Sequence, residues 1–285
     1  MKEPTAGQVR RREVARTWTS AGPFAAIHLA CVFVVVFPPT VGLLGLAAAG
    51  YALRMWALTA GFHRYFAHRA FRTGRTFQLV LAIAGCTAMQ QGPLWWASWH
   101  RRHHHATDAP GDPHSPRLDG FWHAHVGWIF DGKHDSHDGS NVRDLAAYPE
   151  LRWLNRHANV PVAVYAAACL AIAGPAGVVW GFVVSTVALM QATFLVNSVA
   201  HVWGTRRFDT PDGSRNNAIV AILTFGEGWH NNHHRYMTSA RQGLRWWEVD
   251  VTYYTLRALA WLGVVRDLRQ PPLDRDRRRP RAALA

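Results

Sequence analysis

Two long stretches without charged residues constrain this chain more than any other feature. Residues 17–53 and 157–205 contain no Lys, Arg, Asp or Glu over 37 and 49 positions. Each stretch is long enough for two membrane-crossing helices of about 20 residues. Helix-stopping residues interrupt both near the centre, a Pro-Pro pair at 38–39 and the sequence GPAG at 174–177. The pattern predicts an all-α integral membrane protein whose four transmembrane helices form two hairpins.

The basic residues indicate how these helices are oriented. Lys and Arg precede the first apolar stretch, fill residues 64–156 and follow residue 205, whereas neither hairpin turn carries one. The positive-inside rule therefore places both termini and the central segment in the cytoplasm. We expect a multi-pass protein of a bacterial inner membrane, with hairpins at about 21–61 and 158–202 and a cytoplasmic helical cap formed by 62–157 and 203–267.

The remaining segments and the net charge indicate partners. Residues 1–20 read as a basic cytoplasmic segment, and 268–285 read as a basic disordered tail. The formal charge of +13 suits anionic lipid headgroups, phosphorylated ligands or acidic proteins, and we expect no nucleic-acid partner.

A third uncharged run, residues 76–100, is interrupted at Gln90, Gln91, Gly92 and Pro93. If it crossed the bilayer, the histidine-rich segments on its two sides would be separated by about 30 Å of hydrocarbon. A helix partly embedded at the cytoplasmic interface is the expected arrangement.

The 17 histidines are concentrated in a few motifs, HRYFAH, WHRRHHH, NSVAH and GEGWHNNHH. Two of these contain HxxHH, and on a helix positions i, i+3 and i+4 fall within an arc of about 100°. Asn197 lies one helical turn before His201 and could hold a metal ion through water. The candidate metal ligands are His63, His68, His100, His103, His104, His201, His230, His233 and His234.

Nine neutral nitrogens would serve two transition ions with four or five ligands each, and imidazole suits iron, zinc and copper. Carboxylate-rich helical di-iron proteins use Glu and ExxH motifs, but the predicted spans contain no Asp or Glu. An all-nitrogen centre of two irons at the membrane face, which activates dioxygen, is the favoured interpretation.

At these motifs the chain resembles the membrane fatty acyl-CoA desaturases of the stearoyl-CoA, delta-9 type. HRYFAH, HRRHH, NSVAH and GEGWHNNHH match that family's histidine boxes and additional histidine in order and spacing, and DPHSPRLDGFWHAHVGW at 112–128 matches a further stretch. The resemblance runs from about residue 22 to 267. It implies four transmembrane helices with a cytoplasmic domain, two irons, and O₂-dependent insertion of a cis double bond, expected at delta-9, into a saturated long-chain acyl thioester.

The resemblance also implies roles for individual residues. One iron would be held by His63, His68, His100, His104 and His230, and the other by His103, His201, His233 and His234, with Asn197 acting through water. Lys133 aligns with a basic position that meets the nucleotide phosphates of acyl-CoA, whereas Ser98 stands where animal relatives carry Arg. An acyl carrier protein or an intact phospholipid therefore remains a possible carrier.

Tryptophans are candidates for the wall of a tunnel that measures distance along the acyl chain. Trp229 is the preferred one, because its neighbours are candidate ligands. The full set is Trp95, Trp96, Trp99, Trp180, Trp203 and Trp229.

No haem-binding HPGG, cysteine cluster or GxGxxG fingerprint occurs in the chain. Electrons are therefore expected from a separate donor, a ferredoxin or a small b-type cytochrome served by a flavoprotein reductase. Two alternatives remain: an acyl or alkane hydroxylase with the same metal chemistry, and a metal transporter.

Overall fold

A computed structural model describes residues 21–131 and 139–272 of the protein. Lys133, the expected headgroup contact, lies outside these residues. The described residues are mainly helical, and they carry one two-stranded antiparallel pairing, β1 (Arg72–Thr73) with β2 (Val265–Arg266). The predicted all-helical class is confirmed for this part of the chain.

The first apolar stretch forms two helices. A helix spans Ala21–Val35 and ends in the 3₁₀ segment η1 (Ala30–Val35). After the two prolines, α2 (Val41–Trp56) begins with Thr40 as its cap, because the Thr40 side chain accepts a hydrogen bond from the Leu43 N–H. It continues directly into the π-helical segment η2 (Ala57–Ala67).

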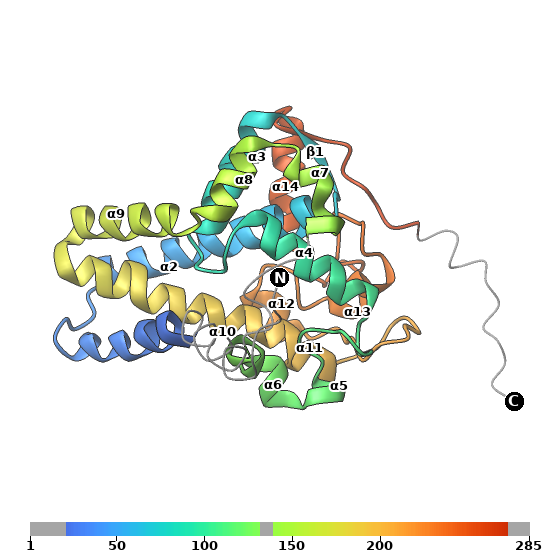
Figure 1. Ribbon diagram of the computed structural model, residues 1–285, viewed down its shortest axis with the longest axis horizontal. Helices are drawn as coiled ribbons and strands as arrows, with labels where there is room; N and C mark the ends of the chain where they lie inside the picture. Colours follow the sequence, from blue (N-terminus) through green and yellow to red (C-terminus); the bar gives the residue numbers. More distant parts are fainter. Residues whose placement is uncertain (1–20, 132–138, 273–285) are drawn as a thin grey trace, which may run out of the picture.

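The second apolar stretch forms α9 (Asn159–Gly177), η5 (Val178–Val184), α10 (Ser185–Asn197) and the short α11 (Val199–Val202). Helical geometry is lost at Ala173 and Gly174, and Gly174 has φ +60°, a conformation that glycine adopts without a steric penalty. The chain reverses there, so that α9 and α10 lie antiparallel (Figure 1). The predicted helix-stopping residues thus interrupt the helices in both hairpins.

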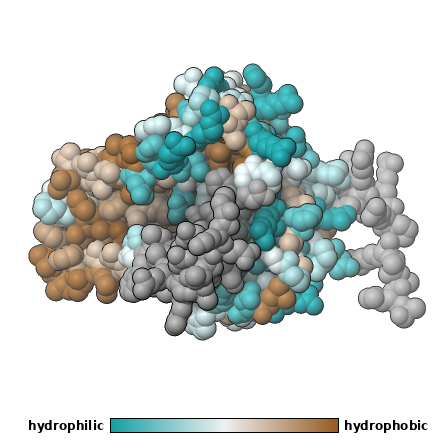
Figure 2. All heavy atoms as spheres, viewed as in Figure 1, coloured by the Kyte–Doolittle hydropathy of each residue, from teal (hydrophilic) through white to brown (hydrophobic). Residues whose placement is uncertain are grey.

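The hairpin helices extend together to one end of the molecule (Figure 1), where Figure 2 shows mainly hydrophobic residues. Val41–Ala67 and Asn159–Val202 are long and apolar enough to span a membrane, yet only 28% and 17% of their most apolar windows are buried. Val41 is 89% exposed and Ile172 is 68% exposed. Core helices of a soluble protein would bury such residues, so this apolar surface suits a lipid environment.

Shorter elements form the other half of the molecule, which is more hydrophilic (Figure 2). The uncharged run at 76–100 becomes two helices, α3 and α4, separated at residues 87–92 where the interruption was predicted. The elements not yet named are α3 (Arg75–Cys86), α4 (Pro93–His105), α5 (Pro116–Asp119), α6 (Phe121–His125), η3 (Gly127–Phe130), η4 (Gly139–Val142), α7 (Arg143–Ala146), α8 (Pro149–Arg156), α12 (Ala218–Leu223), α13 (His230–Arg235) and α14 (Val251–Trp261).

A buried arginine joins η2 to the C-terminal part of the chain. Arg64 has a side-chain exposure of 1%, and its guanidinium lies 3.1 Å from Glu227 Oε1 and 2.9 Å from Asp250 Oδ1. It also donates to the carbonyl of Ala240 at 2.7 Å. Because both carboxylates are buried, their charges depend on this guanidinium.

Replacement of Arg64 should therefore destabilise the fold. Arg64→Met leaves two buried carboxylates without their cation, and we expect a loss of about 3–5 kcal/mol in unfolding free energy. Thermal unfolding in detergent measures it. The control is Arg75→Met, which removes an exposed pair with Glu150 and should change the melting temperature little. Equal shifts for the two variants would contradict the assignment.

Candidate metal centre

Four helical segments bring the predicted histidines together. The π-helix η2 carries His63 and ends next to His68, α4 carries the second motif, α11 carries His201 and α13 carries the third motif. Pro93 at the first turn of α4 has no N–H to leave unpaired, so the helix begins cleanly after the break at 87–92. A π-helical segment inside a longer helix is a frequent feature of functional sites.

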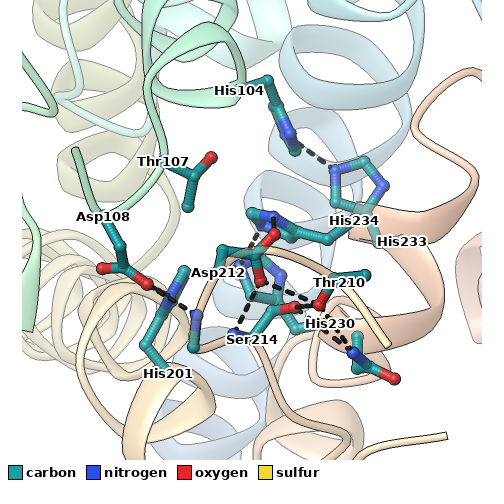
Figure 3. Close-up of polar contacts among 12 residues, drawn as sticks. His104, Thr107, Asp108, His201, Thr210, Asp212, Ser214, His230, His233 and His234 are labelled. Carbon is teal, nitrogen blue, oxygen red and sulfur yellow. Dashed lines mark hydrogen bonds and ion pairs between the residues drawn. The ribbon is translucent and has the colours of Figure 1, made fainter. Parts of the chain in front are cut away.

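The nine histidines form two groups, in each of which all the candidate ligand atoms lie within 4.8 Å of one another. The first group is His63, His68, His100, His104 and His233. The second group is His103, His201, His230 and His234. Figure 3 shows members of both groups facing a common region.

The division differs from the expected one at α13, because His233 belongs to the first group and His230 to the second. Both HxxHH motifs follow one rule: positions i and i+4 share a group, and position i+3 enters the other. Positions i and i+4 are only about 40° apart around a helix, whereas i+3 lies about 100° from i+4. The sequence interpretation followed this rule at α4 but not at α13, where the periodicity alone could have indicated it.

The nitrogen separations fit coordination by a metal ion. In the first group the Nε2 atoms of His63 and His233 are 3.1 Å apart, and those of His104 and His233 are 2.9 Å apart. In the second group His230 Nε2 lies 3.0 Å from Nε2 of both His201 and His234. Metal–nitrogen bonds of about 2.0–2.1 Å place neighbouring ligand nitrogens about 2.9–3.4 Å apart.

Carboxylates lie behind four of the rings, at the nitrogen that faces away from the groups. His63 Nδ1 is 2.5 Å from Glu227, His103 Nδ1 is 2.8 Å from Asp112, and His234 Nδ1 is 3.2 Å from Asp212. His201 Nδ1 is 3.6 Å from Asp108. Figure 3 shows Asp108 and Asp212 beside their histidines. A carboxylate there holds the proton on Nδ1 and leaves a lone pair on Nε2, the arrangement of metal-binding histidines.

Burial keeps six of the nine imidazoles neutral. Loss of hydration lowers the pKa of His68, His100, His104, His230 and His233 well below the usual value, and neighbouring imidazoles lower it further. Burial also lowers the pKa of His234, to about 4, although Asp212 opposes the shift. A neutral imidazole is the form that binds a metal.

The carboxylates remain ionised for the complementary reason. Burial alone would raise the pKa of Asp108, but hydrogen bonds from His201 and Ser115 outweigh it and lower that pKa to about 2. The same balance, with His103 and His234 as the respective partners, lowers the pKa of Asp112 and of Asp212.

The sequence analysis did not identify these four carboxylates. Glu227 precedes His230 by three residues within GEGWHNNHH, and Asp108 and Asp112 follow the second motif closely. A carboxylate so near a histidine motif is the signal that was available for these three. Asp212 carries no such signal, because its contact with His234 joins residues 22 positions apart.

A cavity of about 310 Å³ adjoins both groups, since its wall includes His63 and His100 of the first and His103 and His230 of the second. Trp96 lines the cavity and stacks on His100, with ring centroids 4.8 Å apart. The Trp96 indole donates to Gln90 Oε1 at 3.3 Å, and the Gln90 amide donates to Thr193 at 2.8 Å. These bonds fix one side of the wall between α4 and α10.

The predicted tryptophans have different positions. Trp95, Trp96 and Trp99 line the cavity. Trp229, the preferred candidate, is buried but is not among the described residues that line it, and its indole donates to the carbonyl of Val249 at 2.8 Å. Trp180 donates to the carbonyl of Phe37. Asn197 lines the cavity.

Helical hairpins with an apolar surface and two adjacent groups of imidazoles define a membrane-type helical protein with a candidate two-metal centre. The family model for fatty acid desaturases matches residues 38–266. The chain belongs to the fatty acid desaturase family, and it is accordingly an oxidoreductase of lipid metabolism.

Several characterised relatives are similar over most of their length. An acyl-CoA C20 Δ5-desaturase of Anemone leveillei is 37% identical over 279 residues, which cover 94% of this chain and 88% of the relative. An sn-2 palmitoyl-lipid 9-desaturase of Nostoc sp. is 38% identical, with coverage of 74% and 76%. A hex-5-enoyl-[acyl-carrier protein] acetylenase of Moorena producens is 38% identical, with coverage of 80% and 77%.

Removal of the carboxylate behind His234 should weaken metal retention. Asp212→Asn keeps the shape of the side chain but no longer fixes the His234 proton, so we expect metal affinity to fall about 10–100-fold. Metal content after dialysis against a graded chelator, measured by mass spectrometry, tests this. Asp209→Asn is the control, because the Asp209 side chain is fully exposed in the same loop. Unchanged retention in Asp212→Asn would refute the role.

Proposed function

We propose that the protein is an O₂-dependent fatty acyl desaturase that introduces a cis double bond into a saturated long-chain acyl group. The observation that carries the proposal is the pair of imidazole groups on the wall of one cavity, in a chain of the desaturase family. Two bound iron ions would supply the activation of dioxygen needed to remove two hydrogens from unactivated methylenes.

The chain's own residues would hold these irons in two sets. His63, His68, His100, His104 and His233 would hold one, and His103, His201, His230 and His234 the other, with Asn197 acting through water. Glu227, Asp108, Asp112 and Asp212 would orient the rings from behind. The absence of a carboxylate from both groups supports iron in an all-nitrogen environment over the carboxylate-rich type of centre.

The cavity would hold the acyl chain beside the histidines. Each buried methylene contributes about 0.8 kcal/mol, so a long chain binds mainly through its tail. Because every methylene has the same chemistry, the position of the double bond must follow from the distance between the headgroup and the irons. The similarity to the Nostoc relative, an sn-2 palmitoyl-lipid 9-desaturase, supports the delta-9 position.

The carrier of the acyl chain is proposed to be a thioester, with acyl-CoA as the first candidate. The relatives act on acyl-CoA, on a lipid-linked acyl group and on an acyl carrier protein. Lys133 would meet the headgroup. Trp229 would contribute to substrate binding only indirectly, since the cavity wall is formed by other tryptophans.

The membrane arrangement is proposed to have four spans. The hairpins at 21–61 and 158–202 would cross a bacterial inner membrane, and the segments 62–157 and 203–267 would form the cytoplasmic cap of one desaturase domain. The basic residues 1–20 and 268–285 would lie on the same side. The excess of Lys and Arg outside the hairpin turns supports this orientation.

A separate protein is proposed to deliver the electrons. A ferredoxin, or a small b-type cytochrome with its flavoprotein reductase, would dock on the cytoplasmic face. The net charge of +13 would favour an acidic carrier through electrostatic complementarity.

Expression in a bacterial host that lacks its own desaturase tests the activity. We expect new monounsaturated fatty acids in total lipid, lighter by two hydrogens than their saturated precursors, and their absence in His233→Ala together with loss of bound iron. Mass spectrometry locates the double bond. A product heavier by one oxygen would support the hydroxylase alternative, and metal uptake into vesicles without lipid oxidation would support a transporter.

Thiol labelling in intact cells tests the topology. Ala173→Cys, at the exposed reversal of the chain within α9, should react with a membrane-impermeant reagent in intact cells. Ser140→Cys, exposed in η4, should react only after permeabilisation. The native cysteines are buried or partly buried, so the unmodified protein provides the background. Labelling of both variants in intact cells would rule out the four-span arrangement.

A further inference from the structure

An arginine lies fully buried inside the membrane-type half of the molecule. Arg54 belongs to α2 and has an exposure of 0%. Its Nε donates to the carbonyl of Gly50 at 3.0 Å, and its Nη1 donates to Thr186 Oγ1 at 2.6 Å. Its Nη2 donates to Ser185, and the guanidinium lies 4.5 Å from the centre of the Tyr165 ring.

No carboxylate forms an ion pair with Arg54 among residues 21–131 and 139–272. Neutral oxygens and one aromatic face therefore surround the charge. A buried cation within an apolar helix is costly and is usually retained for function. The candidate metal centre does not use it, since its ligands begin nine residues later at His63.

Arg54 is enclosed by a cage that consists of Ser185, Thr186, the Tyr165 ring and the Gly50 carbonyl. The position of this cage relative to the cavity indicates its role. Along α2 the lining residue farthest from His63 is Met55, and Arg54 is the next residue. Along α10 the lining residue farthest from His201 is Met190, and Thr186 lies one turn beyond it. On α9 the last lining residue is Val162.

Tyr165 lies one turn beyond Val162, toward the hairpin end of α9. The members of the cage on three helices therefore lie just beyond the last lining residue of each helix. The cage therefore lies directly behind Met55, Val162 and Met190, which form the floor of the cavity at the end away from the histidines.

The helices around the cage are packed too closely to move apart at this end of the cavity. A Cβ atom at Gly50 would lie 2.1 Å from the Tyr165 hydroxyl, and one at Gly181 would lie 2.9 Å from the Leu46 side chain. The Tyr165 hydroxyl also donates to the Gly181 carbonyl at 2.8 Å. Small residues thus bring α2, α9 and η5 into direct contact around the arginine.

We propose that Arg54 and its hydroxyl cage hold the floor of the acyl cavity in place from behind and so set the longest acyl chain that the protein accepts. The inference rests on the proposed desaturase function and names a specificity-determining residue within it. A longer chain would have to displace hydrogen bonds to a buried charge. Losing one such bond costs more than burying one further methylene gains.

The test compares chain lengths of the unsaturated products. Arg54→Met keeps a long side chain but removes the charge and all its hydrogen bonds, so the floor becomes compressible. We expect the ratio of the product two carbons longer to the wild-type main product to rise about tenfold. Gas chromatography with mass spectrometry measures this ratio in cells fed both saturated precursors. The ratio is independent of how much variant accumulates.

Leu53→Met is the matched control, because Leu53 is the neighbouring residue and is 58% exposed on the outer face of α2. It should leave the ratio unchanged. An active Arg54→Met enzyme with the wild-type ratio would overturn the inference. If Arg54→Met does not accumulate, Thr186→Val, which is isosteric and removes one acceptor, should shift the ratio in the same direction, and an unchanged ratio there would also overturn it.

If the wild-type protein makes no unsaturated product, the proposed function is contradicted, and this inference is contradicted with it. An active wild-type protein whose Arg54→Met and Thr186→Val variants keep the wild-type product ratio would overturn this inference alone. The two failures are therefore distinguishable.

Discussion

The candidate metal centre depends on histidine side chains that stay neutral while the lone pairs of their Nε2 atoms point toward a common position. Burial and mutual repulsion lower the pKa values of histidines such as His230 and His233, and carboxylates hold protons on the nitrogens that face away from the groups. Three of these four carboxylates serve the second group and one serves the first. The two groups are thus chemically unequal, and the second is the richer in electron-donating partners.

One carboxylate connects this chemistry to the stability of the fold. Glu227 contacts both His63 and the buried Arg64, and Arg64 in turn pairs with Asp250 at the start of α14. Segments more than 160 residues apart in sequence therefore meet at a single charged cluster. Because the cluster orients a candidate ligand and also joins η2 to the C-terminal region, the candidate metal centre cannot form without the tertiary structure that surrounds it.

The cavity links the histidines to the apolar hairpins. Its wall begins at the imidazoles and continues along α2, α9 and α10 as far as the cage around Arg54. In the proposed function the irons and the floor mark two points along one acyl chain, and the continuous helix formed by α2 and η2 joins Arg54 to His63 between these points. Rigid helices fix a distance of this kind more reliably than loops can.

The sequence by itself determined the features that depend on local pattern. These are the apolar helices, their interruptions at 38–39 and 174–177, and the faces that carry three imidazoles, because hydrophobic length and helical periodicity act within one segment. Only the tertiary structure decided which histidines of the other segments each face of α13 meets, that Asp212 supports His234, and that Trp229 lies off the cavity wall. Those outcomes follow from how remote helices pack, and no periodicity within a single segment specifies the neighbour that a face will meet.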